Sequence, residues 1–480
     1  MTNETTAPDL QRLFEPRTLA VVGASNTPGK MGYRVSQRLA AAFAGELHLV
    51  NPREAIIHGR PGCPDLGAVP GPIDLALGLV PAEQLLPIVA ALPKGHVRFF
   101  WAIAGGFGEL SAAGKAREAE LLALATERGM RLIGPNSAGM LNCPFGLNAS
   151  LLPDLPPAGR GVSLVTQSGG LGMALAIYAE DHQLPIAKLA DLGNTSDLEI
   201  AEVLAYLRQD PDTRVVGLFL ESVRDGEAFA RELEALSAAK PVIFTRLGRT
   251  PAGRRASLAH LGIEPGLAPA AARAAGRWSI PAETSGDLFN IAKALAFQPL
   301  PRGRRVAIIT GSGGIGSELA ELCVEHGLEV PDAPAAIEPA LARHLPRYAT
   351  VGNPVDLTPI WWEFPEMYPA LIKVLLQSDA FDLVIVGLLD VAPTVEGMIE
   401  AMERLARDPD FQAMGKPAYV FWNALHAYRP KLRVVEAAGF PCFTTALETV
   451  RTVAAVAAHG SAVARGRTVA AEPPLLVETA

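Results

Sequence analysis

The chain contains 480 residues, of which 49% are hydrophobic and 19% are charged. This composition supports packed cores and excludes disorder of the whole chain, and the length predicts two to four domains at roughly 100–200 residues each. Lys and Arg total 42 against 50 Asp and Glu, so the formal net charge of -8 argues against a general nucleic-acid binder.

Short apolar runs alternate with amphipathic segments along most of the chain. Apolar runs separated by helices of about 10–15 residues predict parallel sheets covered on both faces, which is the doubly wound α/β class. In the first part of the chain, helices are expected at Val35–Ala44 and Ala113–Arg128. The apolar runs there are TLAVVGA (18–24), ELHLVNP (46–52), DLALGLVP (74–81), VRFFWAI (97–103) and MRLIGPN (130–136).

This pattern restarts twice, each time after a Pro- and Gly-rich break. The breaks at 151–161 and 297–305 are followed by the predicted strands VSLVTQ and VAIITG. Each restart runs from its strand into a glycine-containing turn, as the first strand does. We therefore expect three α/β domains and a tail, at 1–150, 151–298, 299–465 and 466–480.

Several kinds of site and location are disfavoured by what the sequence lacks. The four cysteines lie far apart without a CxxC pair, and the nine histidines are scattered, so no disulfide framework and no metal site is predicted. No apolar stretch reaches the ~18–20 residues of a membrane-spanning helix. The first residues lack the basic start and apolar core of a secretory signal. We expect a cytoplasmic protein that binds no membrane.

All three glycine turns are candidate phosphate sites, because ligands of such sheets bind where strands end and helices begin. The turn at 23–30 looks like a P-loop, but five residues separate its glycines and Met31 stands where Ser or Thr would bind magnesium. The turn at 311–316 matches GxGxxG, with Glu329 near the usual distance of a ribose-binding acid. NAD binding at this turn therefore stays an alternative.

Eight segments, in one order along residues 12–460, carry a resemblance to a known family. They are LAVVGASNTPGKMGYRV (19–35), LVNPRE (49–54), AIAGGFGEL (102–110), RLIGPNSAGMLN (131–142), SLVTQSGGLG (163–172), LGNTSDLEIAEVLAYLRQDPDTRVVGLFLES (192–222), LGRTPAGRRASLAHLG (247–262) and GNPVDLTP (352–359). The chain resembles the CoA-binding and acyl-transfer half of NDP-forming acyl-CoA synthetases, which are related to the succinyl-CoA ligase alpha subunit. The resemblance implies a Rossmann-like CoA-binding domain followed by two flavodoxin-like ligase domains.

The resemblance also implies a missing partner. Family members need an ATP-grasp domain that binds ATP or ADP and Mg²⁺, and nothing in this chain looks like one. We therefore expect an alpha subunit that forms a hetero-oligomer with an ATP-grasp beta subunit. Its substrates would be CoA and a small carboxylic acid, and the net reaction would interconvert acyl-CoA, NDP and phosphate with acid, CoA and NTP.

The family reaction passes through an acyl phosphate and a phosphohistidine, and His260 matches that histidine. Imidazole suits the relay because it is nucleophilic near neutral pH. Glu221, which follows the run VVGLFL, matches the acid that orients the ring and fixes its tautomer. Asp197 is a weaker candidate for the same neighbourhood. The turn formed by Ser168, Gly169 and Gly170 matches the phosphate-binding turn that would stabilise the phosphohistidine.

By the same carry-over, CoA would lie along the first domain. The turn after the first strand would approach its phosphates, the end of the second strand would meet the adenosine part, and a glycine loop would flank the pantetheine end, near the reacting centre. The residues of these segments are Gly23, Ala24, Ser25 and Lys30; Asn51 and Pro52; Gly105, Gly106 and Phe107; and Asn136.

One departure from the family pattern motivates a second hypothesis. Many relatives read Ser-His-Thr-Gly around the histidine, where this chain has Ala259, His260, Leu261 and Gly262. A CoA- or acyl-CoA-binding protein of the same fold, without phosphoryl transfer and with a regulatory or scaffolding role, is therefore the alternative. The sequence does not identify the acid.

Overall fold

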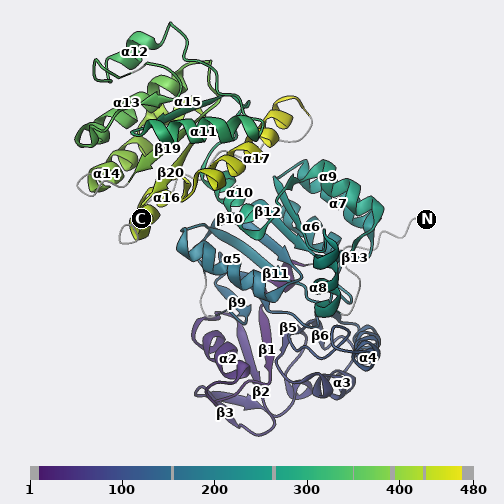
Figure 1. Cartoon of the computed structure of the whole chain (residues 1–480). Coiled ribbons are helices and arrows are strands. Elements are labelled where there is room, and N and C mark those ends of the chain that lie inside the picture. Colours follow the sequence, from purple (N-terminus) through teal and green to yellow (C-terminus); the bar gives the residue numbers. More distant parts are fainter. Residues whose placement is uncertain are drawn as a thin grey trace. The chain divides into compact units, whose positions relative to one another are not determined.

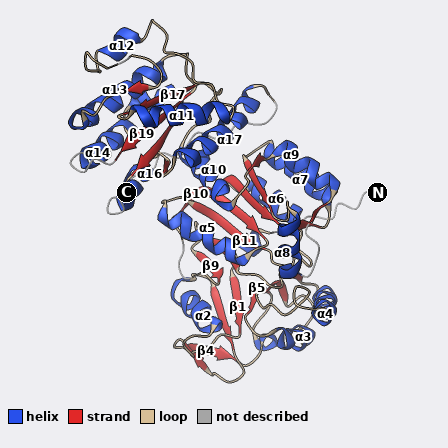
Figure 2. Ribbon diagram, viewed as in Figure 1, coloured by secondary structure: helices blue, strands red, loops and turns tan. Residues whose placement is uncertain are grey.

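The computed structural model describes residues 10–152, 156–261, 266–349, 351–389, 395–424 and 429–466, without the side chains of residues 259–261. The chain folds into two compact units, one built mainly from residues up to 279 and the other mainly from residues 280 onward. Helices flank parallel sheets in both units (Figure 2), so the predicted doubly wound α/β class is confirmed.

The first sheet has the strand order β3-β4-β2-β1-β5-β6-β7. The strands are β1 (Thr18–Val22), β2 (Glu46–Val50), β3 (Ile56–Ile57), β4 (Arg60–Cys63), β5 (Ile73–Gly78), β6 (Val97–Ala102) and β7 (Arg131–Ile133). The helices around it are α1 (Gln11–Phe14), α2 (Met31–Ala42), η1 (Leu66–Ala68), α3 (Ala82–Ala90) and α4 (Ala112–Arg128). Every residue of β5 is buried, as expected for a strand covered on both faces. In Figure 1, α2 lies on one side of β1, and α3 and α4 lie together on the other.

The second sheet has the order β16-β14-β12-β10-β11-β8-β9. Its strands are β8 (Gly139–Asn142), β9 (Leu147–Ser150), β10 (Ala158–Thr166), β11 (Ile186–Asp191), β12 (Thr213–Leu220), β14 (Val242–Arg246) and β16 (Ile280–Pro281). A separate two-stranded sheet pairs β13 (Ser222–Val223) with β15 (Gly266–Leu267). The helices are α5 (Gly169–Asp181), α6 (Ile200–Gln209), α7 (Gly226–Ser237), α8 (Pro251–Leu261) and α9 (Pro269–Trp278).

The hairpin β8–β9 crosses the division that the sequence predicts at residue 150. Its residues precede that position, yet β8 pairs antiparallel with β11, with Leu141 opposite Leu189. The hairpin therefore lies in the second sheet, although it follows the last strand of the first by only a few residues. The apolar pattern of the sequence alone did not reveal that the hairpin belongs to the second sheet.

The second unit contains a five-stranded sheet with the order β18-β17-β19-β20-β21. Its strands are β17 (Val306–Thr310), β18 (Val355–Asp356), β19 (Leu383–Leu389), β20 (Ala418–Asn423) and β21 (Cys442–Phe443). The helices are α10 (Ser285–Phe297), α11 (Gly313–Glu325), α12 (Glu338–Ala342), η2 (Trp361–Glu363), α13 (Phe364–Gln377), α14 (Val395–Ala406), α15 (Pro409–Met414), α16 (Arg429–Ala437) and α17 (Ala446–Ala464).

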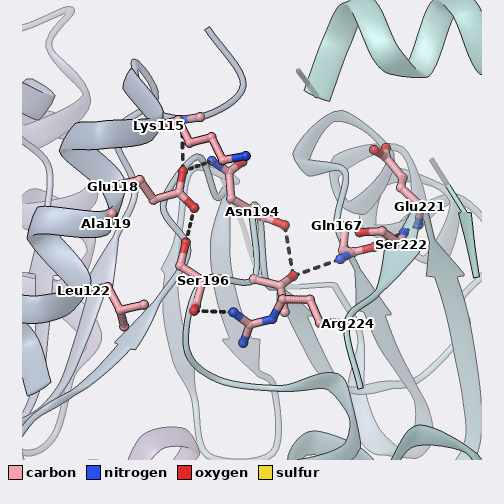
Figure 3. A pocket seen from close by; sticks show the side chains of 13 residues that line it. Lys115, Glu118, Ala119, Leu122, Gln167, Asn194, Ser196, Glu221, Ser222 and Arg224 are labelled. Atoms are coloured by element: carbon pink, nitrogen blue, oxygen red, sulfur yellow. Dashed lines mark hydrogen bonds between the residues drawn. The ribbon is translucent and has the colours of Figure 1, made fainter. Parts of the chain in front are cut away.

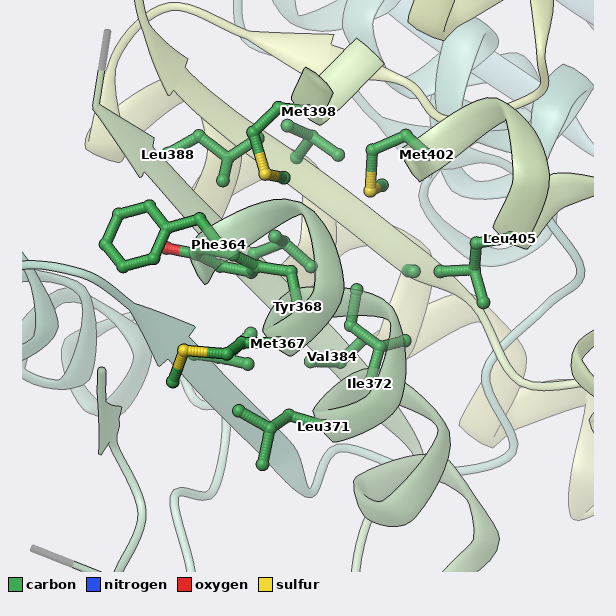
Figure 4. Close-up of a cluster of buried hydrophobic side chains, with 14 of the residues drawn as sticks. Phe364, Met367, Tyr368, Leu371, Ile372, Val384, Leu388, Met398, Met402 and Leu405 are labelled. Carbon is green, nitrogen blue, oxygen red and sulfur yellow. The ribbon is translucent and has the colours of Figure 1, made fainter. Parts of the chain in front are cut away.

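Alternate residues of β19 face two different layers of this unit. Val384 and Leu388 join a buried cluster with Tyr368 of α13 and Met402 of α14 (Figure 4). Ile385 between them is fully buried as well. Because side chains on both faces of β19 are buried, helices must cover both faces of the strand. This explains the continuous apolar run in the sequence.

Candidate functional site

Three neighbouring strands of the second sheet end at the same edge and bring polar groups together there. β10 lies between β11 and β12 and is parallel to both. The turn Gln167–Gly170 follows β10, Asp191 ends β11 and Glu221 follows β12. The chain moves from β10 to one side for β11 and to the other for β12, which makes this edge a topological switch point, where ligands bind in such sheets.

Gln167 connects the turn to both neighbouring strand ends. Its side-chain carbonyl accepts hydrogen bonds from the backbone N–H groups of Glu221 and Ser222, at 2.8 and 3.0 Å. Its amide nitrogen donates to the hydroxyl of Thr195 at 2.9 Å (Figure 3). Gln167 therefore fixes the position of Glu221 relative to the turn. Gln167 lies within the motif SLVTQSGGLG, but the sequence alone assigns it no role.

Glu221 is a buried acid with an unsatisfied oxygen. The residue is only 2% exposed, and its Oε2 atom has no hydrogen-bond partner among the described residues. Burial, with a smaller contribution from the charge of Asp191, raises the pKa of Glu221 to about 7. The carboxyl group therefore changes its charge near neutral pH, which suits a group that acts on a histidine.

Asp191 is a second buried acid at this edge, and sequence reasoning did not single it out. Its carboxylate accepts hydrogen bonds from the backbone N–H groups of Ala138 and Gly193. Burial raises the pKa of Asp191 to about 7. A Cβ atom on Gly169 would lie 3.1 Å from this carboxylate and 2.9 Å from the Cβ of Ala138. The turn thus needs glycine at position 169 because it packs directly against the acid.

The predicted phosphate turn is accessible and begins a helix. α5 starts at Gly169, and the backbone N–H of Ser168 donates to the hydroxyl of Thr166 at 2.9 Å. A Cβ atom on Gly170 would meet nothing within 4 Å, so the space in front of this residue is open. The first N–H groups of an α-helix have no partner within the helix and attract anions.

His260 belongs to α8, the helix that follows β14. β14 neighbours β12 in the second sheet. The imidazole itself lies outside the described residues, so its distance from Glu221 and from the turn stays a prediction. Asp197, the weaker candidate, accepts from Nε of Arg131 at 3.0 Å and from the backbone N–H of Leu132 at 2.8 Å. It is therefore held in a contact with β7.

A cavity of about 680 Å³ lies at the ends of β1 and β2 in the first sheet. Its lining combines apolar side chains with the polar and charged groups of the glycine turn and of the following loop. Five of the predicted CoA-contacting residues line it, namely Gly23, Ser25, Lys30, Asn51 and Pro52, and the apolar lining includes Val22, Val50, Leu66, Val80 and Ile88. Apolar walls with a few convergent polar groups are typical of cofactor sites.

The glycine turn of this cavity is closely packed. Gly23 has φ +91°, and a Cβ atom there would lie 2.8 Å from Val80. Ala24 is fully buried, and its carbonyl accepts from the side chain of Asn51 at 2.7 Å. Sequence reasoning missed Glu54, which accepts from Ser25 Oγ at 2.9 Å and from the backbone N–H of Asn26 at 2.8 Å. These two bonds are the largest favourable contributions that lower the pKa of Glu54.

The loop that contains Gly105, Gly106 and Phe107, which were predicted to flank the pantetheine end of CoA, lies between the two sheets of the first unit. The backbone N–H groups of Gly106 and Phe107 donate to Glu109, and Gly105 packs against Asn136, its missing Cβ being 3.3 Å from the amide oxygen. Asn136 has φ +59° and donates to the side chain of Asn194 at 3.3 Å. This loop and Asn136 therefore do not line the cavity of the first sheet.

A second cavity, of about 290 Å³, lies beside this loop and is called the α4 cavity below. One wall is the loop end Gly108 and the α4 residues Lys115, Glu118, Ala119 and Leu122. The opposite wall is Gln167, Gly193–Ser196, Glu221, Ser222 and Arg224 (Figure 3). The α4 cavity thus joins the predicted acid Glu221 to the surroundings of the glycine loop.

Glu329, the acid that the sequence offered for a dinucleotide site, does not lie at the GxGxxG turn of the second unit. The backbone of Glu329 pairs with Arg305, which precedes β17, whereas the glycines follow the strand. Glu329 therefore lies at the opposite end of the strand from the turn. Among the described residues, no group of His, Cys, Asp or Glu side chains could hold a metal ion, and no helix could cross a membrane.

Family models match three successive parts of the chain. A CoA binding domain matches residues 17–142, a succinyl-CoA ligase like flavodoxin domain matches residues 159–295, and a ligase-CoA domain matches residues 306–421. These matches, together with the parallel sheets and the switch-point edge, define the class as CoA ligases. The chain belongs to the family of the ADP-forming acetate–CoA ligase alpha subunits, and is the alpha subunit of an NDP-forming acid–CoA ligase.

The sequence and structural similarity to the relatives extends over most of the chain. The alpha subunit of acetate–CoA ligase (ADP-forming) II from Pyrococcus furiosus is 32% identical over 90% of this chain and 94% of that protein. Acetate–CoA ligase (ADP-forming) I from Archaeoglobus fulgidus is 29% identical over 95% of this chain but only 65% of its own length. The dinucleotide-forming acetyl-CoA synthetase 1 of Ca. Korarchaeum cryptofilum, solved with phosphate and ADP, superposes with a TM-score of 0.82 and 28% identity over 96% of this chain and 98% of that one.

Proposed function

We propose that this chain binds CoA on its first sheet and relays phosphate through His260 on its second. The observation that carries the proposal is the convergence of Gln167, Asp191 and Glu221 on one sheet edge, beside the Ser168–Gly170 turn. Two buried acids and an open helix N-terminus form a site for a phosphorylated imidazole, because the acid fixes the ring and the helix N–H groups bind the phosphate.

The proposed reaction has three steps. A ring nitrogen of His260 attacks the terminal phosphorus of the nucleoside triphosphate, and the bond to the departing diphosphate breaks. A carboxylate oxygen of the organic acid then attacks the phosphohistidine, which forms an acyl phosphate and frees the imidazole. Finally the CoA sulfur attacks the acyl carbon, so that the thioester forms and inorganic phosphate leaves. Glu221 holds the ring in the nucleophilic tautomer and stabilises its positive charge.

CoA is proposed to occupy the cavity at the ends of β1 and β2. Lys30 and Arg53 line this cavity and supply positive charge for phosphates, while Leu66, Val80 and Ile88 offer an apolar surface. Glu54 already occupies the hydrogen-bond donors of Ser25 and Asn26. The phosphates would therefore approach Lys30 and Arg53 rather than these two donors.

The triphosphate and Mg²⁺ are proposed to bind a separate ATP-grasp beta subunit in the cytoplasm. The support is the length of the Archaeoglobus relative, of which this chain covers 65%, and the printed designation "subunit alpha" of the Pyrococcus relative. Acetate, the acid in the names of these relatives, is the first substrate to assay.

A phosphorylation assay tests the relay. The chain and its co-expressed beta subunit are incubated with labelled ATP and Mg²⁺, and the protein is analysed for acid-labile, base-stable phosphate. We expect labelling of the wild-type chain and none of His260→Ala. His182→Ala, which removes an imidazole elsewhere, is the matched control and should label normally. Labelling of His260→Ala at the wild-type level would refute the relay, and an unlabelled wild type would favour the non-catalytic alternative.

A further inference from the structure

The α4 cavity is larger than acetate requires. Its volume of about 290 Å³ corresponds to roughly ten water molecules at ~30 Å³ each. Acetate would fill less than half of this space and would leave the remainder to water. The cavity lies beside Glu221 on one side and the glycine loop on the other, so it adjoins both the proposed phosphate relay and the loop expected at the pantetheine end.

The α4 wall of the cavity is formed by residues of one helical face, and these residues determine its chemistry. Lys115, Glu118, Ala119 and Leu122 follow the spacing i, i+3, i+4, i+7 and share one face of α4. Ala119 and Leu122 make one end of this face apolar, and Lys115 places an ammonium group at the other end. Figure 3 shows Leu122 and Glu118 on the α4 side and Glu221 across from them.

Glu118 is not available to a ligand because its carboxylate is already satisfied. It accepts from the backbone N–H of Gly108 and from the amide of Asn194, both at 2.9 Å, and also from the hydroxyl of Ser196. These bonds join α4 to the loop after β11. The carboxylate therefore builds the cavity wall and does not need a cation from a substrate.

The two cationic side chains of the cavity differ in availability. Arg224 donates to Glu199 at 2.8 Å and to the carbonyl groups of Ser196 and Asp197 at 2.6 and 3.2 Å. The ammonium group of Lys115 has no hydrogen bond or ion pair within the described part of the chain, whereas the backbone N–H of this residue donates to the carbonyl of Ser111. The cavity thus offers one cation for one anionic group. A second carboxylate placed against Ala119 and Leu122 would meet apolar side chains and no cation, so a dicarboxylate should bind more weakly than a monocarboxylate.

We propose that the α4 cavity binds the acid substrate and selects a monocarboxylic acid with an apolar tail larger than a methyl group. The carboxylate lies toward Gln167 and Lys115, near the proposed phosphate relay, and the tail lies against Ala119 and Leu122. The identity of the bound acid as a substrate rests on the proposed function, whereas its binding can be measured without catalysis.

Binding of 4-fluorobenzoate to the purified full chain, followed by fluorine NMR, tests the site directly. Ala119→Leu adds bulk inside the cavity. Ala116→Leu adds the same atoms to an exposed position of α4 that does not line the cavity, and is the matched control. We expect the wild type and Ala116→Leu to bind alike and Ala119→Leu to bind at least tenfold more weakly. Failure of the wild type to bind 4-fluorobenzoate, or equal binding by the two leucine variants, would overturn the proposal that the α4 cavity binds the acid.

Two further measurements separate substrate class from reaction. Acetate and succinate are titrated against bound 4-fluorobenzoate; strong displacement by succinate would overturn the preference for one carboxylate. With the beta subunit present, Ala119→Leu should lower kcat/KM for benzoate at least tenfold more than for acetate, as expected for removal of space in an apolar pocket. Binding without any thioester formation would refute the proposed function alone. Thioester formation with unchanged selectivity in Ala119→Leu would refute this inference alone.

Discussion

At the scale of single residues, the buried pair Asp191 and Glu221 governs the pH dependence of the site. Both carboxyl groups have a pKa raised to about 7 by burial, and the charge of Asp191 contributes to the shift of Glu221. When two acids influence each other in this way, the apparent pKa values belong to the pair. The charge at this sheet edge, where we propose that the phosphohistidine binds, is therefore set by both acids.

Replacing Asp191 with Asn should move the pH dependence of His260 phosphorylation to lower pH. A negative charge at Asp191 raises the pKa of Glu221, so its removal lowers that pKa, and Glu221 becomes ionised at a lower pH. The measurement is the labelling rate between pH 5 and pH 9 in ~0.5-unit steps, with the acidic limb compared between variants.

Asp212→Asn is the control for this shift. It removes the same charge from a residue that precedes β12, at the opposite end of the strand from Glu221. Its acidic limb should coincide with that of the wild type. A limb that moves equally in both variants, or one that moves to higher pH in Asp191→Asn, would contradict the assigned coupling.

These residues also show where sequence reasoning stops. Glu221 is identified by its motif. Asp191 also ends an apolar run, but nothing in the sequence distinguishes it from an ordinary acid at a strand end, which is usually solvated. Its importance arises from Ala138 and Gly169, which approach from other parts of the chain. For His260, motif matching places the residue on α8, but the sequence does not give its distance from the acids.

At the scale of elements, the turn between β1 and α2 depends on close backbone contact. A Cβ atom on Gly32, in the first turn of α2, would lie 1.9 Å from the carbonyl oxygen of Gly23. The helix and the turn can therefore touch only because position 32 carries no side chain. Gly23 itself lines the cavity assigned to CoA.

Gly32→Ala should weaken CoA binding by at least tenfold, because α2 must move away from the turn that forms the cavity. Isothermal titration calorimetry of the full chain with CoA measures the change. Gly276→Ala, in helix α9 where a Cβ atom would meet nothing within 4 Å, is the control and should bind CoA normally. Equal affinity in the two variants would mean that CoA does not depend on this turn.

The glycine turns themselves were predictable, and the elements around them partly so. A strand that runs into a glycine turn and a helix has a strong local signature, and the turns after β1, β10 and β17 were all placed correctly. The α4 cavity was not predicted, because one wall comes from α4 and the loop before it and the other from the segments that follow β10, β11 and β12. Only the packing of the two sheets brings these segments together.

At the scale of the molecule, Arg131 connects the two sheets of the first unit. It begins β7 of the first sheet and binds Glu202 of α6 through two bonds of 2.9 Å and Asp197 through Nε. These hydrogen bonds and the two negative charges raise the pKa of Arg131. Its charge therefore persists at all accessible pH values, and the contact does not depend on pH in the neutral range.

Arg131→Gln should loosen this connection. The variant leaves Asp197 and Glu202 without their cation, and we expect a loss of about 2 kcal/mol, since hydrogen bonds to charged groups contribute roughly 1.5–3 kcal/mol. Faster amide hydrogen exchange in β7 and in the loop after β11 would show it. Arg98→Gln, which removes the contact of an exposed arginine with the buried Asp74 inside the first sheet, is the control and should leave this exchange unchanged.

The hairpin β8–β9 sets a limit on how this protein can be divided. A fragment cut at residue 150 would carry two strands whose partner, β11, remains on the other fragment. The hairpin would then expose an unpaired strand edge on the first fragment. On the second fragment, β11 would lose its neighbour β8 and become an edge strand. Recombination between relatives, in the laboratory or in evolution, should therefore keep the hairpin together with the second sheet, so that viable crossovers fall upstream of Gly139 or downstream of the last strand of that sheet.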